Sequence, residues 1–208
     1  IIGTTEDTDP LGKIKKITLL YNLVDEVSSG EKQDILADED TVSAVNEIYD
    51  SLTKENFIVE LFPLTELNVS KLFELKTDII FNLCYGIGAL PKSEDEVAGI
   101  LSKVGIPFTG AGAKAIRMTT DKAVTKKIFI DNHIPTPDYQ VFVSPFDTLD
   151  PHMQFPLIVK PKGEDCSFGI HNDAVVEDIL SLKKRLAYVM STYHEPVLVE
   201  EYIEGREL

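Results

Sequence analysis

Three short apolar runs, separated by segments with helical spacing, constrain how the first half of this chain can fold. The runs predict strands at Lys16–Asn22, Phe57–Phe62 and Asp78–Cys84, and the last is as apolar as a parallel strand covered on both faces. Between and after them, apolar residues recur at helical spacing and predict helices at Asp40–Lys54, Val69–Leu75 and Ser93–Val104, with Ser93 as a cap. The alternation predicts a βαβαβ unit with a parallel sheet.

The second half of the chain predicts a different mixture of elements. Strands are expected at Tyr139–Val143, at Leu157–Val159 and at Pro196–Ile203. Helices are expected at Asp121–Asn132, with Thr120 as N-cap, and at Val175–Thr192. The fold class is therefore α/β, with no internal repeat.

The charge balance limits the partners that such a chain can bind. Twenty Lys and Arg stand against 35 Asp and Glu, so the formal net charge is −15. This charge repels nucleic acid and anionic membrane surfaces, and no nucleic-acid or membrane partner is expected. An anionic ligand must be held by local positive groups. Two cysteines and the lack of a signal-peptide-like or membrane-spanning stretch predict a cytoplasmic protein.

A lysine and a glycine-bearing loop follow the apolar run at Leu157–Val159. Lys160 is expected at the end of this short buried strand, where its ammonium can reach a ligand. Gly163 and Gly169 permit backbone conformations closed to other residues, so successive amides and the Ser167 hydroxyl could turn toward phosphate oxygens. The alternative is a lysine-ended surface strand followed by an ordinary turn.

Other candidate residues have weaker signals. Lys122 opposes the helix dipole in a first helical turn, so it either is solvated or has an anion nearby. Tyr85–Gly88 lacks the third glycine of a dinucleotide fingerprint. Cys84 reads as a small core residue, whereas Cys166 could be a reactive thiol beside Lys160. The four histidines lack metal-ligand spacing, and the run Lys183-Lys184-Arg185 is expected on a solvated helix face.

Three stretches occur in one order: Thr119–Lys122, Leu157–Gly169 and Val199–Glu207. Together with Gly105–Gly110 and Ile134–Pro137, they resemble the D-alanine–D-alanine ligase branch of the ATP-grasp superfamily. The resemblance implies a Rossmann-like pre-ATP-grasp domain at residues 14–117. The first part of an ATP-grasp α+β domain would follow at residues 118–208, and residues 1–13 would form a flexible extension.

The resemblance also implies nucleotide-binding roles for particular residues. Lys122 and Lys160 match the two family lysines that touch nucleotide phosphates, and the loop Gly163–Gly169, with Ser167, matches the flap over them. The remaining matches border the adenine or the ribose. Glu200 would face the exocyclic amine, backbone groups of Glu201 and Ile203 would pair with the ring beside Tyr202, and Glu207 would hold the ribose hydroxyls. The alternative is an acidic edge strand kept soluble by its charges.

The implied activity is ATP-dependent ligation of a carboxylate to an amine through an acyl phosphate, with magnesium. The substrates would be two D-alanines for peptidoglycan, or other amino acids. Because the sequence stops at Leu208, the magnesium ligands and the main catalytic residues are expected beyond it, with no metal ligand in this chain, and these residues alone should be inactive. The alternatives are a non-catalytic nucleotide-binding or regulatory protein, and a dinucleotide oxidoreductase suggested only by the βαβ layout. A homodimer is left open.

Three segments depart from the family pattern, one of them the flap, where Cys166-Ser167 stands in place of a paired serine. The first-strand loop after Leu20 lacks the family's glycine pair, so Asp25 or Glu26 would have to substitute for its glutamate. The turn after the third strand reads Cys84-Tyr85-Gly86 in place of histidine and glycine. These last two changes concern the amino-acid substrate, so a different amino acid or a small carboxylate stays open as the substrate.

Overall fold

The computed structural model describes residues 14–22, 36–87, 93–164, 169–171 and 173–206. The chain divides into two compact units, one ending at Ala113 and the other beginning at Lys114. No helix within the described ranges is long and apolar enough to cross a membrane.

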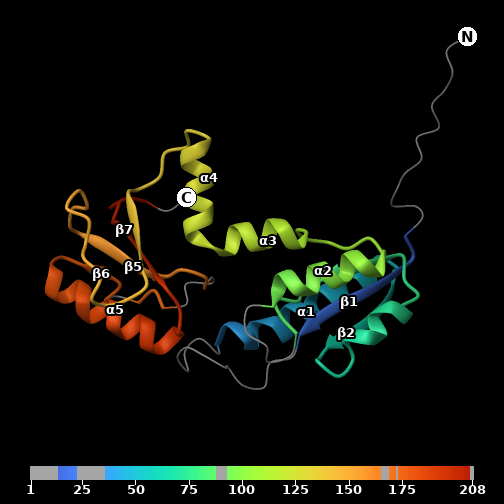
Figure 1. Ribbon diagram of the computed structural model, residues 1–208. Helices are drawn as coiled ribbons and strands as arrows, with labels where there is room; N and C mark the ends of the chain where they lie inside the picture. The colour runs from blue at the N-terminus through green and yellow to red at the C-terminus, as the bar shows by residue number, and fades with distance from the viewer. Residues whose placement is uncertain (1–13, 23–35, 88–92, 165–168, 172, 207–208) are drawn as a thin grey trace, which may run out of the picture. The chain divides into compact units, whose positions relative to one another are not determined.

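The first unit contains a three-stranded parallel sheet with helices packed against it (Figure 1). Its strands are β1 (Lys16–Asn22), β2 (Ile58–Leu64) and β3 (Ile79–Asn82), in the order β2-β1-β3. The helices are α1 (Leu36–Lys54), the 3₁₀ helix η3 (Val69–Glu74) and α2 (Glu94–Val104). The predicted βαβαβ unit is confirmed.

Several boundaries of the first unit differ from prediction, including β3, which ends at Asn82 and not at Cys84, and two of the differences have identifiable reasons. Helix α1 begins at Leu36, four residues before the predicted start, because acidic residues in a first turn favour a helix. Strand β2 continues through Pro63, which is tolerated because β2 lies at the edge of the sheet.

The core of the first unit lies between the sheet and α2. Leu20 and Ile80 from the sheet pack with Val97 and Leu101 of α2, all with no exposed surface. Cys84 belongs to this core, and burial raises the pKa of its thiol, as expected of a structural cysteine. Ser93 is the N-cap residue of α2, as predicted, but its side chain makes no capping hydrogen bond to the helix. Its hydroxyl instead accepts a hydrogen bond from the Ile87 amide at 2.8 Å.

The second unit contains an antiparallel sheet in the order β4-β7-β5-β6. The strands are β4 (Tyr139–Phe142), β5 (Leu157–Pro161), β6 (Val175–Val176) and β7 (Val197–Glu201). Helix α5 (Ile179–Tyr193) covers one face of this sheet (Figure 1). Leu182, Leu186 and Val189 of α5 form a core there with Val159 and Val199.

Two helix predictions in the second unit are corrected. The long helix expected from Val175 is wrong at its start, because Val175 and Val176 pair with β5 as β6 and Asp178 caps α5 through the Ser181 amide. Thr120 does not cap α4, contrary to the prediction. It ends the unpredicted helix α3 (Ala113–Thr120), and Asp121 caps α4 (Lys122–Asp131).

Candidate functional site

Strands β5 and β7 present different chemistry on their two faces. Successive side chains of a strand point to opposite faces, so Val159 and Val199 meet α5 while Lys160 and Glu200 lie on the other face. The register pairs Glu200 with Ile158 on one side and with Tyr139 on the other. Strand pairing therefore places Lys160 diagonally beside Glu200, on a face that does not pack against α5.

Glu200 is a buried carboxylate held by two lysines. Its Oε2 lies 2.6 Å from Lys126 Nζ, and its Oε1 pairs with Lys160 Nζ. The side chains of Glu200 and Lys126 are only 10% and 8% exposed, whereas that of Lys160 is 23% exposed. Lys160 is therefore the member of this trio that solvent, or a ligand, can reach most easily.

Lys126 is fixed by several partners besides Glu200. Its ammonium donates to Thr136 Oγ1 at 2.8 Å and to the Pro137 carbonyl at 2.9 Å. It also lies 5.3 Å from the centre of the Tyr139 ring, within the range of a cation–π contact. A buried ammonium needs such partners, because an unpaired charge in the interior is costly. Lys126 thus anchors α4 to the sheet.

Burial opposes the ionisation of Glu200, but the hydrogen bonds from Lys126 and Lys160 outweigh it and lower the pKa of the carboxyl. A lowered folded-state pKa adds stability above the ordinary value of 4.5, and this stability is lost as pH falls through the lowered pKa. We therefore expect the stability difference between the wild type and Glu200→Gln to be largest near neutral pH and to shrink below pH 4.5. Urea unfolding of both proteins across this range measures it. A difference that grows in acid would contradict the assignment.

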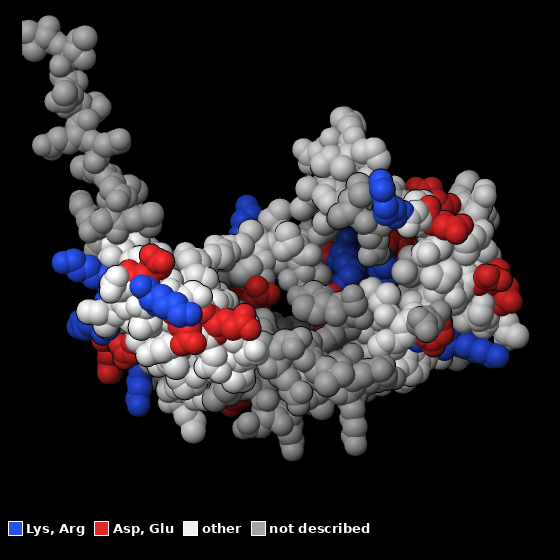
Figure 2. Space-filling view, turned by 180° about the vertical axis from the view of Figure 1, so that it is seen from behind, with Lys and Arg blue, Asp and Glu red and all other residues white. Residues whose placement is uncertain are grey.

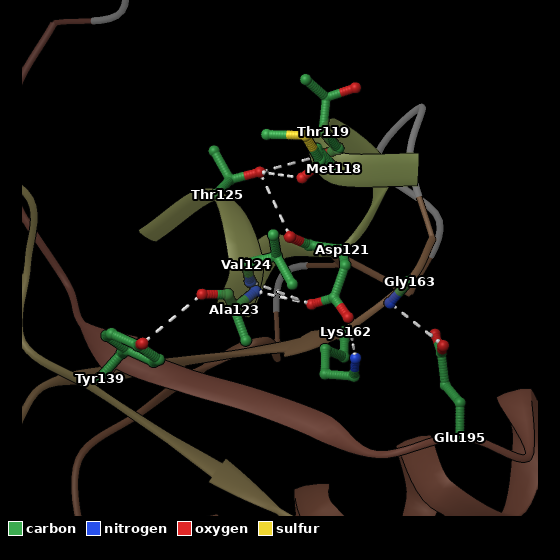
Figure 3. A network of polar contacts seen from close by, with 10 residues as sticks. All are labelled: Met118, Thr119, Asp121, Ala123, Val124, Thr125, Tyr139, Lys162, Gly163 and Glu195. Carbon is green, nitrogen blue, oxygen red and sulfur yellow. Dashed lines mark hydrogen bonds and ion pairs between the residues drawn. The ribbon is translucent and has the colours of Figure 1, made fainter. Parts of the chain in front are cut away.

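A second ion pair ties the start of α4 to the segment after β5 (Figure 3). Asp121 accepts the amides of Ala123 and Val124 at 3.0 and 3.2 Å and also pairs with Lys162 Nζ. Burial opposes ionisation of Asp121, but the Lys162 contact and the two amides lower its pKa. The Lys122 amide donates to the Lys162 carbonyl at 3.1 Å.

The predicted phosphate ligands lie on the elements that these contacts join. Lys160 lies in β5, and Lys122 begins α4, with its ammonium donating to the Glu164 carbonyl. Figure 2 shows basic side chains set back in a hollow of the second unit, while acidic side chains lie on its outer surface. Ser167 and Glu207, together with Cys166 and residues 1–13, lie outside the described residues.

The predicted adenine-binding segment ends β7 and continues beyond it. The Glu201 amide donates to the Asp138 carbonyl and the Tyr202 amide to the Pro156 carbonyl, both at 3.0 Å. Tyr202 and Ile203 are 39% and 67% exposed. The structure therefore brings Glu200 together with Lys160, and holds the backbone of the following residues between two neighbouring segments.

The sequence reasoning missed three members of this site: Asp121, Lys126 and Lys162. Lys126 lies four residues after Lys122, on the same side of α4, and this spacing could have indicated it. Lys162 lies two residues after Lys160, and nothing local distinguishes it from a solvated lysine. Among the described residues, no group of three or more His, Cys, Asp or Glu could hold a metal ion.

Comparisons with known proteins indicate the family to which this chain belongs. No protein-family model matches the chain. It is 35% identical to a D-alanine–D-alanine ligase of Aquifex aeolicus over 66% of this chain and 45% of that protein. It is 34% identical to the corresponding ligase of Chelativorans sp. over 81% of this chain and 53% of that protein.

A solved structure agrees with the sequence matches. The D-alanine–D-alanine ligase of Bacillus anthracis complexed with ATP has a TM-score of 0.68 and 25% identity, covering 92% of this chain and 58% of that one. The fold is thus the ATP-grasp fold expected from the motifs. The chain belongs to the D-alanine–D-alanine ligase family. It spans about half the length of the curated relatives it matches.

Proposed function

We propose that the face carrying Lys160 and Glu200 binds ATP in an ATP-dependent carboxylate–amine ligase. The observation that carries the proposal is the meeting of Lys126 and Lys160 on the buried Glu200 carboxylate, directly before the exposed end of β7. In a chain with a net charge of −15, an anionic nucleotide needs such a local group of lysines. The Bacillus anthracis relative bound to ATP supports the same assignment.

Each predicted residue has a distinct role in this proposal. Lys160 and Lys122 neutralise charge on the phosphates, as lysines do at phosphate sites. Because the Glu201 amide already donates to Asp138, the Glu201 carbonyl is the group that accepts from the adenine amine. Glu200 contributes a further acceptor, since a carboxylate has room for about four hydrogen bonds and two are taken here. Ser167 and Glu207 stay predicted ligands of phosphate and ribose.

The proposed reaction has two steps. ATP transfers its terminal phosphoryl group to a substrate carboxylate, which gives ADP and an acyl phosphate. An amine then attacks the acyl carbon, the amide bond forms, and phosphate leaves. The residues described here hold the nucleotide and balance its charge. Magnesium stays a prediction from the family, and no step is assigned to it.

The substrate is proposed to be D-alanine, on both the carboxylate and the amine side, for peptidoglycan. The test is ADP release by the full-length protein with D-alanine, compared with a pool of other amino acids. Release of ADP with D-alanine supports the proposal. Release of ADP only with another amino acid would instead indicate a related ligase with a different substrate. ATP binding without ADP release under any of these conditions would select the non-catalytic alternative. A homodimer stays a prediction.

Lys160→Ala should weaken ATP binding while changing stability little. The loss of one charge-assisted contact of about 1.5–3 kcal/mol predicts a Kd for ATP raised roughly 10- to 100-fold. Glu200 keeps Lys126, so the fold should persist. Isothermal titration with ATP measures the first effect and thermal unfolding the second. Lys127→Ala is the control, because the Lys127 side chain is 72% exposed in α4. Unchanged ATP affinity in Lys160→Ala would show that Lys160 does not bind ATP.

A further inference from the structure

Arg185 is a buried charge in the middle of α5 that the proposed function does not use. It is 4% exposed, whereas Lys183 and Lys184 before it are exposed, so the prediction of a solvated face is wrong for Arg185. Its Nη1 donates to Asp173 Oδ2 at 2.8 Å and its Nη2 to the Gly169 carbonyl at 2.6 Å. Burying a guanidinium is costly, so the groups that compensate for its burial indicate which part of the structure Arg185 holds in place.

Gly169 is held against the end of β5. Its φ is +70°, and an added Cβ would lie 2.6 Å from Cγ of Pro161, the last residue of β5. Only glycine allows the backbone to approach so closely in this conformation. Arg185 therefore fixes the carbonyl of a glycine whose backbone packs directly on the end of the strand that carries Lys160.

A second contact, from the residue that follows the C-cap of α5, reaches Gly163. The Gly163 amide donates to Glu195 Oε2 at 3.1 Å (Figure 3). Glu195 follows His194, which ends α5 in a left-handed conformation with φ of +55°. The Lys162 amide, one residue earlier, donates to the Pro196 carbonyl at 3.1 Å. Two contacts therefore hold the backbone just after β5 from the end of α5.

From these contacts we infer that Arg185 and Glu195 are positioning residues for ATP binding. Arg185 fixes Gly169, Glu195 fixes Gly163, and both glycines adjoin the end of β5, where the proposed function places the ATP phosphates. The inference rests on that proposed function. Neither side chain contacts the nucleotide in this assignment. They set the backbone that faces the phosphates, so their loss should affect phosphate recognition more than recognition of adenosine.

The test compares ATP with adenosine by isothermal titration in Arg185→Leu and Glu195→Ala. Each variant should raise the Kd for ATP about tenfold, because the displaced backbone weakens hydrogen bonding to the phosphates, and leave the Kd for adenosine unchanged. Lys183→Leu is the matched control, because it removes the same charge and introduces the same residue at an exposed position two residues from Arg185. Unchanged ATP affinity, or an equal loss for ATP and adenosine, would overturn the inference.

Backbone order at Gly169 gives a readout that needs no nucleotide. In ¹⁵N relaxation of the whole chain, the order parameters of Gly169 and Ile170 should fall from about 0.85 to below about 0.6 in Arg185→Leu, with the strands unchanged. If the wild type binds neither nucleotide, the proposed ATP site fails, while this measurement still decides whether Arg185 positions the backbone. If Arg185→Leu does not fold, Asp173→Ala removes its exposed partner and takes its place in both measurements. Unchanged order parameters would overturn the inference.

Discussion

Glu200→Gln should destabilise the second unit by about 3–5 kcal/mol, as expected when one partner of a buried ion pair is removed. Glutamine occupies nearly the same volume but carries no charge. Lys126, whose side chain is 8% exposed, then keeps only neutral oxygens and the Tyr139 ring as partners. Lys160 can turn toward solvent, so most of the loss should come from Lys126. The measurement is urea unfolding at neutral pH, followed by a probe within the second unit.

Two further variants separate charge from packing at Glu200. Glu204→Gln is the matched control, because Glu204 is exposed four residues further along the chain, and it should leave stability unchanged. The double variant Lys126→Met with Glu200→Leu should recover most of the lost stability, since replacing both partners of a buried pair by apolar residues is often neutral. A single variant as stable as the wild type would show that the buried contact contributes nothing.

Val159→Asp should prevent the second unit from folding. Val159 has no exposed surface and packs in the core beneath α5. An aspartate there must be ionised without a partner or protonated against its ordinary pKa, and either costs several kcal/mol, comparable with the whole stability of a domain. Loss of the cooperative unfolding transition by circular dichroism measures the effect.

The control for Val159→Asp is the same substitution at an exposed site in the same unit. Val143, just after β4, is 74% exposed, so Val143→Asp should unfold like the wild type. A Val159→Asp protein with a normal unfolding transition would contradict the packing of β5 against α5.

The sequence predicted the elements whose apolar pattern is strong. Strand β1 has the predicted bounds, because five of its seven residues are buried, four of them in succession. Helix α3 escaped prediction because Ile116 is its one buried residue among those described, which leaves no periodic stripe. The start of α5 was misplaced because the apolar spacing continues back through β6. The cap at Asp178 was the local signal that marked the true start.

Predictions of the site succeeded for residues in motifs and failed for residues defined by tertiary contacts. The motifs indicated Lys160 and Glu200, and strand pairing brings the two together. Lys126 was not singled out and Arg185 was expected on a solvated face, because lysine and arginine are seldom buried. Their burial depends on partners such as Glu200 and Gly169, which are many residues away in sequence. No local pattern shows such a pairing.

Because of its register against β5, strand β7 should tolerate substitution of most of its residues better than a change in its length. A single inserted or deleted residue would turn Glu200 toward α5 and Val199 toward the opposite face, where Lys126 and Lys160 lie, because side chains alternate along a strand. One such event would remove the charged face and break the core together. Sequence change in this part of the molecule should therefore proceed by substitution, with gains and losses of residues confined to the connections between strands.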